Sequence, residues 1–188
     1  MRVDHVGSLL RPESLKQSFR DHALGVLDAA GLRQAQDRAI REVVAKQEAV
    51  GLPVITDGEF RRLNWQVSFS DVAGWDLWSG SWKKLLANPG DKAAHETPLR
   101  KGDDAVLSFR VPATARLKLL KSFPMDEFAF LKKTAKAATK ITLMGPDRVA
   151  QMCDIEGSRA HYAGADEFLA DVVAIQRRMV GELVAAGC

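Results

Sequence analysis

A short apolar run that stops at a turn is the feature that most constrains how this chain can fold. Val54–Thr56 is rich in β-branched residues, which is typical of a buried strand, and Asp57–Gly58 then breaks the strand and turns the chain. Glu59 follows, with Arg61 and Arg62 close behind. Parallel α/β folds keep their chemistry just past the C-terminal ends of strands, so Glu59 is a candidate site residue. The alternative interpretation is a Glu–Arg salt bridge in an ordinary loop.

The residues before this run predict a strand–helix–strand order. Residues 2–8 are expected to form a first strand that ends at Gly7–Ser8, and a helical region extends from there to about His22. A second helix is predicted by an apolar stripe at i, i+3 and i+4 spacing that ends at Gly51. The stripe consists of Leu32, Ala35, Ala39, Ile40, Val43, Val44 and Val50. Because strand, helix and strand alternate, we expect parallel strands with a right-handed crossover.

Residues 63–123 interrupt this alternation and are expected to be an insertion. Val106–Val111 is typical of a strand, and we interpret it as part of a β-hairpin over the mouth of the sheet. The region is also rich in aromatic residues, namely Trp65, Phe69, Trp75, Trp78 and Trp82. A small hydrophobic core beneath a long loop explains these residues more simply than a substrate lid does.

The alternation resumes after the insertion. Asp126–Thr139 is predicted to be a helix, and Ile141–Met144 is predicted to be the next strand, ended by Gly145–Pro146. A last helix is expected from about Asp166, with Gly187 at its C-terminal end. Its apolar stripe contains Phe168, Val172, Ile175, Met179, Leu183 and Val184.

The composition excludes several classes of protein. The chain has 188 residues and a net charge of +3, with acidic and basic residues interspersed, which argues against binding to nucleic acid or to a membrane surface. Its two cysteines, Cys153 and Cys188, are too far apart for a disulfide framework or a zinc finger. No apolar run is long enough to span a bilayer and no signal sequence is evident, so a cytoplasmic protein is expected.

Several segments carry a resemblance to a known family. Val6–Pro12, Gln47–Leu52 and Thr56–Arg62 look, in this order, like segments of the cobalamin-independent methionine synthase family, and most closely like its short, single-barrel members. Lys140–Pro146 is similar to another strand of that family. A Gly-Ser pair or an Asp-Gly-Glu run alone would be weak evidence, but three motifs in register are specific. The resemblance implies an α/β fold of the TIM-barrel type.

The implied fold is larger than this chain. A TIM (β/α)8 barrel usually needs about 250 residues. We therefore expect residues 1–188 to form the N-terminal half of a barrel, as a single partial domain in which 63–123 is an inserted hairpin. A half-barrel has unpaired sheet edges. It is therefore expected to associate, either as a homo-oligomer or with the missing half of the barrel.

The resemblance also implies a binding site for an amino acid. It assigns homocysteine binding to four residues: Val6, Gly7, Ser8 and Glu59. A backbone turn with a serine can hold a carboxylate through N–H and O–H donors, and a glutamate can hold an ammonium group by a charge-assisted hydrogen bond. Three neighbours are expected to support the site without contacting the substrate: His5, Arg11 and Asp57.

The zinc site of the family is not expected in this chain. The family's metal ligands are His, Cys, Glu and a second Cys from later strands, and neither Cys153 nor Cys188 matches that pattern. We therefore expect the isolated chain to hold no zinc and to be inactive in methyl transfer. Met152 stands where methionine synthases place a tryptophan near the pterin. This substitution puts the folate donor in question.

Three functions remain open from the sequence. The resemblance implies a methionine-synthase-like S-methyltransferase that moves the methyl group of 5-methyltetrahydrofolate, or of 5-methyltetrahydropteroyltriglutamate, to homocysteine and so forms methionine. One alternative is a related thiol alkyltransferase with a donor other than folate. The other is a catalytically inactive half-barrel that only associates.

Overall fold

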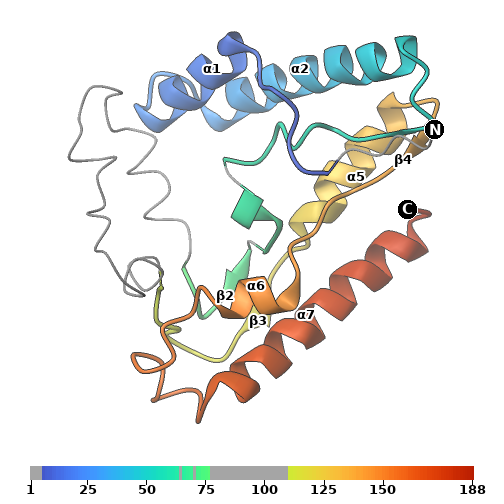
Figure 1. Ribbon diagram of the computed structural model, residues 1–188. Coiled ribbons are helices and arrows are strands. Elements are labelled where there is room, and N and C mark those ends of the chain that lie inside the picture. Colours follow the sequence, from blue (N-terminus) through green and yellow to red (C-terminus); the bar gives the residue numbers. More distant parts are fainter. Residues whose placement is uncertain (1–5, 64, 70, 77–109) are drawn as a thin grey trace, which may run out of the picture. The chain divides into compact units, whose positions relative to one another are not determined.

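The computed structural model describes residues 6–63, 65–69, 71–76 and 110–188, which form a mixed α/β chain with more helix than strand (Figure 1). None of the helices in these ranges is long and apolar enough to cross a membrane. The chain divides into two compact units. The first unit comprises Met1–Ser68, Phe123–Leu143 and Met179–Cys188, and the second unit comprises Phe69–Ser122 and Met144–Arg178.

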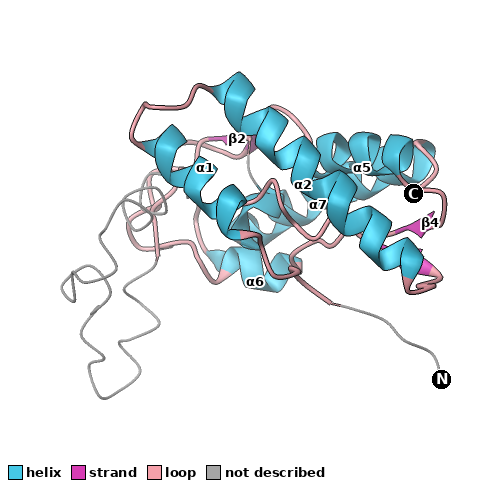
Figure 2. Cartoon of the chain, turned by 90° about the horizontal axis from the view of Figure 1, so that it is seen from above, coloured by secondary structure: helices cyan, strands magenta, loops and turns pink. Residues whose placement is uncertain are grey.

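Two helices that pack on each other begin the first unit (Figure 2). They are α1 (Glu13–Ala23) and α2 (Ala29–Ala49), and both were predicted. The Asp28 carboxylate starts α2 by accepting a hydrogen bond from the Gly31 N–H at 2.7 Å. Gly51 ends it with a φ of 74°, a left-handed conformation that glycine adopts without strain. Of the predicted apolar stripe, Leu32, Ala35, Ala39, Ile40 and Val44 are buried, whereas Val50 is exposed.

A parallel pair of short strands lies in the same unit. β1 (Val54–Ile55) pairs with β4 (Ala138–Thr139). The Lys140 N–H extends the pairing by donating to the Ile55 carbonyl oxygen at 2.9 Å. Ile55 is fully buried, as predicted, but Val54 is partly exposed.

The strand β4 begins earlier in the sequence than predicted. The helix expected over Asp126–Thr139 is α5 (Phe123–Thr134), and Ile141–Met144, the expected strand, is not in a strand. The Glu48 side chain at the end of α2 gives a physical reason. Its Oε1 atom accepts hydrogen bonds from the backbone N–H groups of residues 136–137, at 2.6 and 3.3 Å. These donors are satisfied outside a helix, so the chain leaves α5 and enters the strand.

The predicted first strand is wrong for the part of it that the structure describes. Residues 6–8 are not in a strand, and Gly7 has a left-handed φ of 84°. The rest of the predicted strand, including His5, lies outside the described residues. Leu9 donates its backbone N–H to the Gly58 carbonyl oxygen at 3.2 Å. The N-terminal segment therefore runs beside the turn that follows β1.

The second unit contains an antiparallel pair within the predicted insertion. β2 (Val72–Ala73) pairs with β3 (Lys118–Leu119). Residues 106–109 of the predicted strand lie outside the described residues, and Val111 forms an isolated parallel bridge with Cys153.

Aromatic packing forms the core of the second unit. Trp75 packs edge-on against Phe69 and Phe168, with ring centroids 6.3 and 5.1 Å away. This agrees with the predicted small core, while Trp78 and Trp82 lie outside the described residues.

The remaining elements of the described chain are a 3-10 helix at Trp65–Phe69, the short helix α6 (Pro146–Ala150) and the long helix α7 (Ala165–Ala185). The α7 stripe is buried as predicted at Phe168, Val172, Ile175, Met179 and Leu183, whereas Val184 is exposed.

Candidate active site

The turn after β1 is built by side chains that replace sheet pairing. The Gln47 amide donates to the Thr56 carbonyl oxygen at 2.8 Å and accepts from the Thr56 N–H at 3.1 Å. The Thr56 hydroxyl then accepts from the Gly58 N–H at 3.2 Å. Asp57 Oδ1 accepts from the Glu59 N–H at 2.9 Å. The backbone N–H groups of Thr56, Gly58 and Glu59 are thereby satisfied by side chains and not by a neighbouring strand.

Two consecutive residues of this turn have a left-handed backbone. Gly58 has a φ of 70° and Glu59 a φ of 59°. A Cβ atom on Gly58 would also lie 2.9 Å from the Phe60 ring, so the position needs glycine. For a residue with a side chain this conformation costs about 1–2 kcal/mol. Such strain is held in place by the surrounding structure and is concentrated at functional sites.

The Glu59 carboxylate is buried but keeps one oxygen open. Its Oε1 atom accepts a hydrogen bond from the Thr142 hydroxyl at 2.6 Å. The same oxygen lies 3.3 Å from Nη1 of Arg62. Both contacts within the described part of the chain go to Oε1, and Oε2 has no hydrogen-bond partner there. A buried carboxylate with a free oxygen suits an ammonium group.

Arg62, which contacts Glu59, also forms a buried ion pair with Glu127. Arg62 donates from Nε and Nη2 to the two oxygens of Glu127, at 2.8 and 2.7 Å, and from Nη2 to the Thr142 carbonyl oxygen at 2.7 Å. Glu127 comes from α5 and is 0% exposed. Burial, reinforced by the negative charge of Asp57, outweighs the attraction of Arg62 and raises the pKa of Glu127 to about 7. Burial lowers the pKa of Arg62, but its contacts with Glu127 outweigh burial and raise it overall.

Arg11 connects the N-terminal segment to this turn. Its Nη2 atom donates to the carbonyl oxygens of Glu59 and Arg62, at 3.1 and 2.8 Å. Burial lowers the pKa of Arg11 and raises the pKa of Asp57. Arg11 Nε and Asp57 Oδ2 are buried without a hydrogen-bond partner in the described ranges. Arg11 and Asp57 thus support the backbone of the turn by hydrogen bonds.

The other arginine of the motif does not face Glu59. Arg61 pairs with Asp37 at 2.5 Å, and its guanidinium stacks 4.5 Å from the centre of the Phe130 ring. Asp37 belongs to α2 and Phe130 to α5. Arg61 therefore ties these two helices together, and only Arg62 forms the Glu–Arg pair that the motif suggested.

Of the predicted site residues, Arg11, Asp57 and Glu59 meet at the turn after β1. Gly7 and Ser8 precede Leu9, whose backbone is hydrogen-bonded to the turn at Gly58. Val6 is 90% exposed, and Ser8 is exposed as well. The position of His5 lies outside the described residues.

Two residues of the site were missed by sequence reasoning. Thr142 lay within a predicted strand, and only its contact with Glu59 shows its role. Glu127 was overlooked on the predicted helix, where Phe128 and Leu131 were taken as the inward face. A charged residue beside this inward face is the signal that could have identified it.

The described residues do not fit a zinc site. Burial raises the pKa of the Cys153 thiol, whose sulfur lies 3.5 Å from the Ser158 hydroxyl, and Cys188 is exposed. Zinc needs thiolate or imidazole ligands that converge on one point. Within the described ranges, no three side chains of His, Cys, Asp or Glu are grouped to hold a metal ion.

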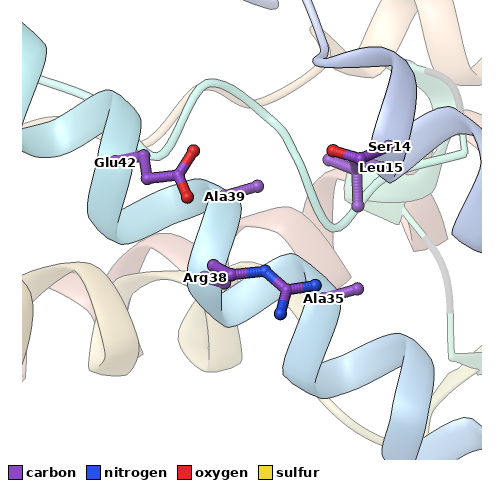
Figure 3. Close-up of a pocket in the computed structure, with 6 residues that line it drawn as sticks. All are labelled: Ser14, Leu15, Ala35, Arg38, Ala39 and Glu42. Carbon is purple, nitrogen blue, oxygen red and sulfur yellow. The ribbon is translucent and has the colours of Figure 1, made fainter.

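A small pocket lies elsewhere in the first unit, between α1 and α2 (Figure 3). Its volume of about 20 Å³ has room for little more than a water molecule. It is lined by Ser14, Leu15, Ala35, Arg38, Ala39 and Glu42. None of the residues of the Glu59 turn lines it.

The fold and the site define a mixed α/β chain with buried carboxylates at the end of a parallel strand. No family model matches this chain. It is 28% identical over 188 residues to the uncharacterized protein YxjH of Bacillus subtilis, a match that covers 100% of this chain and 46% of that protein. It is 26% identical over 185 residues to the methionine synthase of Sulfurisphaera tokodaii, which covers 97% of this chain and 48% of that protein.

This chain is also similar to a solved structure. It is that of a Listeria monocytogenes protein assigned provisionally as a vitamin-B12 independent methionine synthase. The TM-score is 0.73 at 25% identity, and the match covers 100% of this chain and 49% of the other. The resemblance to cobalamin-independent methionine synthases is therefore confirmed over the whole chain. The chain spans about half the length of the relatives that it matches.

Proposed function

We propose that this chain forms the amino-acid-binding part of a methionine-synthase-like S-methyltransferase. In this proposal the acceptor is homocysteine and the donor is 5-methyltetrahydrofolate or its polyglutamate form. The observation that carries it is the buried Glu59 carboxylate, held on a strained left-handed backbone with Oε2 open. Glu59 would bind the substrate ammonium, and Val6, Gly7 and Ser8 would bind its carboxylate.

The proposed fold is the N-terminal half of a (β/α)8 barrel. The parallel pairing of β1 with β4 and the matches to about half of each relative support it. The apolar side chains of Val6, Val180 and Val184 are exposed in the first unit. They support association with a second copy or with the other half of a barrel. A monomeric mass by light scattering, together with a cooperative melt, would contradict this part of the proposal.

Methyl transfer itself is not assigned to this chain alone. When bound, a zinc ion lowers the pKa of a substrate thiol, but the described residues do not offer ligands for it. Elemental analysis of the purified chain is expected to find less than one zinc per chain, and a methionine-formation assay is expected to match its blank. One tightly bound zinc, or turnover above the blank, would overturn this assignment.

Homocysteine binding tests the proposal directly. The chain is expected to bind L-homocysteine in calorimetry, and Glu59→Gln is expected to weaken binding by about 1.5–3 kcal/mol, the value of a hydrogen bond to a charged group. The melting temperature of this variant should change little, because the Gln side chain keeps the shape and the Thr142 contact. A lower melting temperature with unchanged binding would show that Glu59 is structural.

A further inference from the structure

We propose that Glu127 is a positioning residue, which holds the guanidinium of Arg62 so that Oε2 of Glu59 stays open to the ammonium group of an amino-acid ligand. The proposal rests on the function proposed above for Glu59. It adds a residue that lies on α5, 68 positions along the chain from Glu59, and that none of the sequence motifs includes.

The hydrogen bonds of Arg62 show how it is held. An arginine side chain has five N–H donors in a fixed plane. Nε and Nη2 of Arg62 are directed at the two oxygens of Glu127, and Nη2 also reaches the Thr142 carbonyl oxygen. Only Nη1 faces Glu59, at 3.3 Å from Oε1. The edge of the guanidinium formed by Nε and Nη2 is therefore occupied by Glu127.

Arg62 and the ligand compete for the same carboxylate. A guanidinium whose forked edge is free pairs with both oxygens of a carboxylate at once. Without the negative charge of Glu127, the carboxylate that Arg62 already contacts is Glu59. A Glu59 side chain paired in that way has no open oxygen for an ammonium group. Glu127 thus keeps Arg62 from occupying the place of the ligand.

The charges around Arg62 favour the same conclusion. Three carboxylates, those of Asp57, Glu59 and Glu127, act on its guanidinium. Arg11 and Arg61 are further nearby cations, but Arg11 donates its hydrogen bonds to backbone carbonyl oxygens of the turn and Arg61 pairs with Asp37, so the Glu59 carboxylate receives a hydrogen bond from neither. An ammonium group from a ligand would place a positive charge beside Oε2 of Glu59, which none of these cations contacts among the described residues.

The first test measures two ligands on two proteins. L-Homocysteine and 4-mercaptobutanoate, which has the same thiol and carboxylate but no ammonium group, are titrated into the wild-type chain and Glu127→Gln. The variant is expected to raise the Kd of homocysteine about tenfold or more, and to leave that of 4-mercaptobutanoate unchanged. Equal losses for both ligands, or no loss for homocysteine, would overturn the proposal.

A double variant separates positioning from folding, because Glu127→Gln leaves a buried charge unpaired. Arg62→Met combined with Glu127→Met removes the competing cation together with its anchor. Homocysteine binding is then expected to recover to within about threefold of wild type, since the two substitutions are coupled and not additive. Binding weaker than in Glu127→Gln would show that the pair acts only as structural support.

The outcome can be separated from that of the proposed function. If the wild-type chain binds no homocysteine, the proposed function fails, and a crystal structure of Glu127→Gln decides the inference alone. The expected structure has Arg62 hydrogen-bonded to both oxygens of Glu59. An Arg62 side chain that keeps its present orientation would overturn the inference. If homocysteine binds equally well to wild type and variant, the inference fails and the proposed function stands.

Discussion

The two units of this chain place their charges differently. In the first unit Asp57, Arg62 and Glu127 are buried. Solvent therefore does not screen the ion pair between Arg62 and Glu127. In the second unit Arg116 pairs with Glu167 and Asp171 at the surface. The same types of residue thus form an interior network in one unit and a solvated network in the other.

The described core of the second unit is built without a buried charged side chain. Tyr162 packs edge-on against Phe168 at 5.1 Å, and its hydroxyl donates to Asp171 and accepts from the Leu117 N–H. Apolar packing of this kind stabilises a fold at least as well as a buried ion pair does. Stability alone therefore does not account for the buried charges of the first unit.

Loss of one partner of the buried pair is expected to have the largest effect. Glu127→Ala should lower the free energy of unfolding by about 3–5 kcal/mol at pH 8, because it leaves the charge of Arg62 buried and unpaired. Urea denaturation measures this change. Arg62→Met with Glu127→Met is the matched control and should lose much less. Equal losses in the single and double variants would show that packing, and not charge, matters there.

The pH dependence of stability should also distinguish the first unit. The pKa of Glu127 is raised to about 7 in the folded state, so the folded chain binds the proton more tightly than the unfolded chain does. The stability that comes from this tighter proton binding is complete below the ordinary pKa of a glutamate and is lost as the pH rises through about 7. Relative to Glu127→Gln, the wild-type chain should lose about 3 kcal/mol across this window. A difference that does not change with pH would contradict the raised pKa.

A backbone effect of intermediate size is expected at Glu59. Glu59→Gly should be more stable than Glu59→Ala by about 1 kcal/mol, because only glycine removes the left-handed strain. Both variants lose the carboxylate and should not bind homocysteine. Asp71 in the second unit has the same φ of 59°. Asp71→Gly and Asp71→Ala are therefore the control, because they measure the same backbone effect at a second left-handed position. An Ala variant as stable as the Gly variant at Glu59 would show that the turn relaxes.

The smallest effect is expected at the surface of the second unit. Arg116→Ala should leave the urea midpoint nearly unchanged, because exposed ion pairs are screened by water and salt. The remaining difference should decrease further at high salt. A large loss that salt does not reduce would mean that the stacking of Arg116 on Tyr162, 4.6 Å from the ring centre, stabilises the unit.

The sequence predicted local features better than distant contacts. Helix α2 follows from its apolar stripe and from Gly51, and the turn at Glu59 follows from Asp57–Gly58, since each depends on neighbouring residues. The position of β4 could not be predicted, because the Glu48 side chain sets it from 88 residues away. The same holds for Glu127, whose partner Arg62 is 65 residues distant.

The side chain of Gln47 fixes the position of helix α2 relative to the turn that carries Glu59. Its amide serves Thr56 as a neighbouring strand would, with one donor and one acceptor. The helix cannot slide or rotate against β1 without breaking both bonds, so the axial position of α2 sets where the turn begins. A saturation library would therefore find position 47 intolerant even of Glu, which offers no donor when ionised. In the design of a related protein, the residue at this position would therefore be selected before the sequence of the turn that it supports.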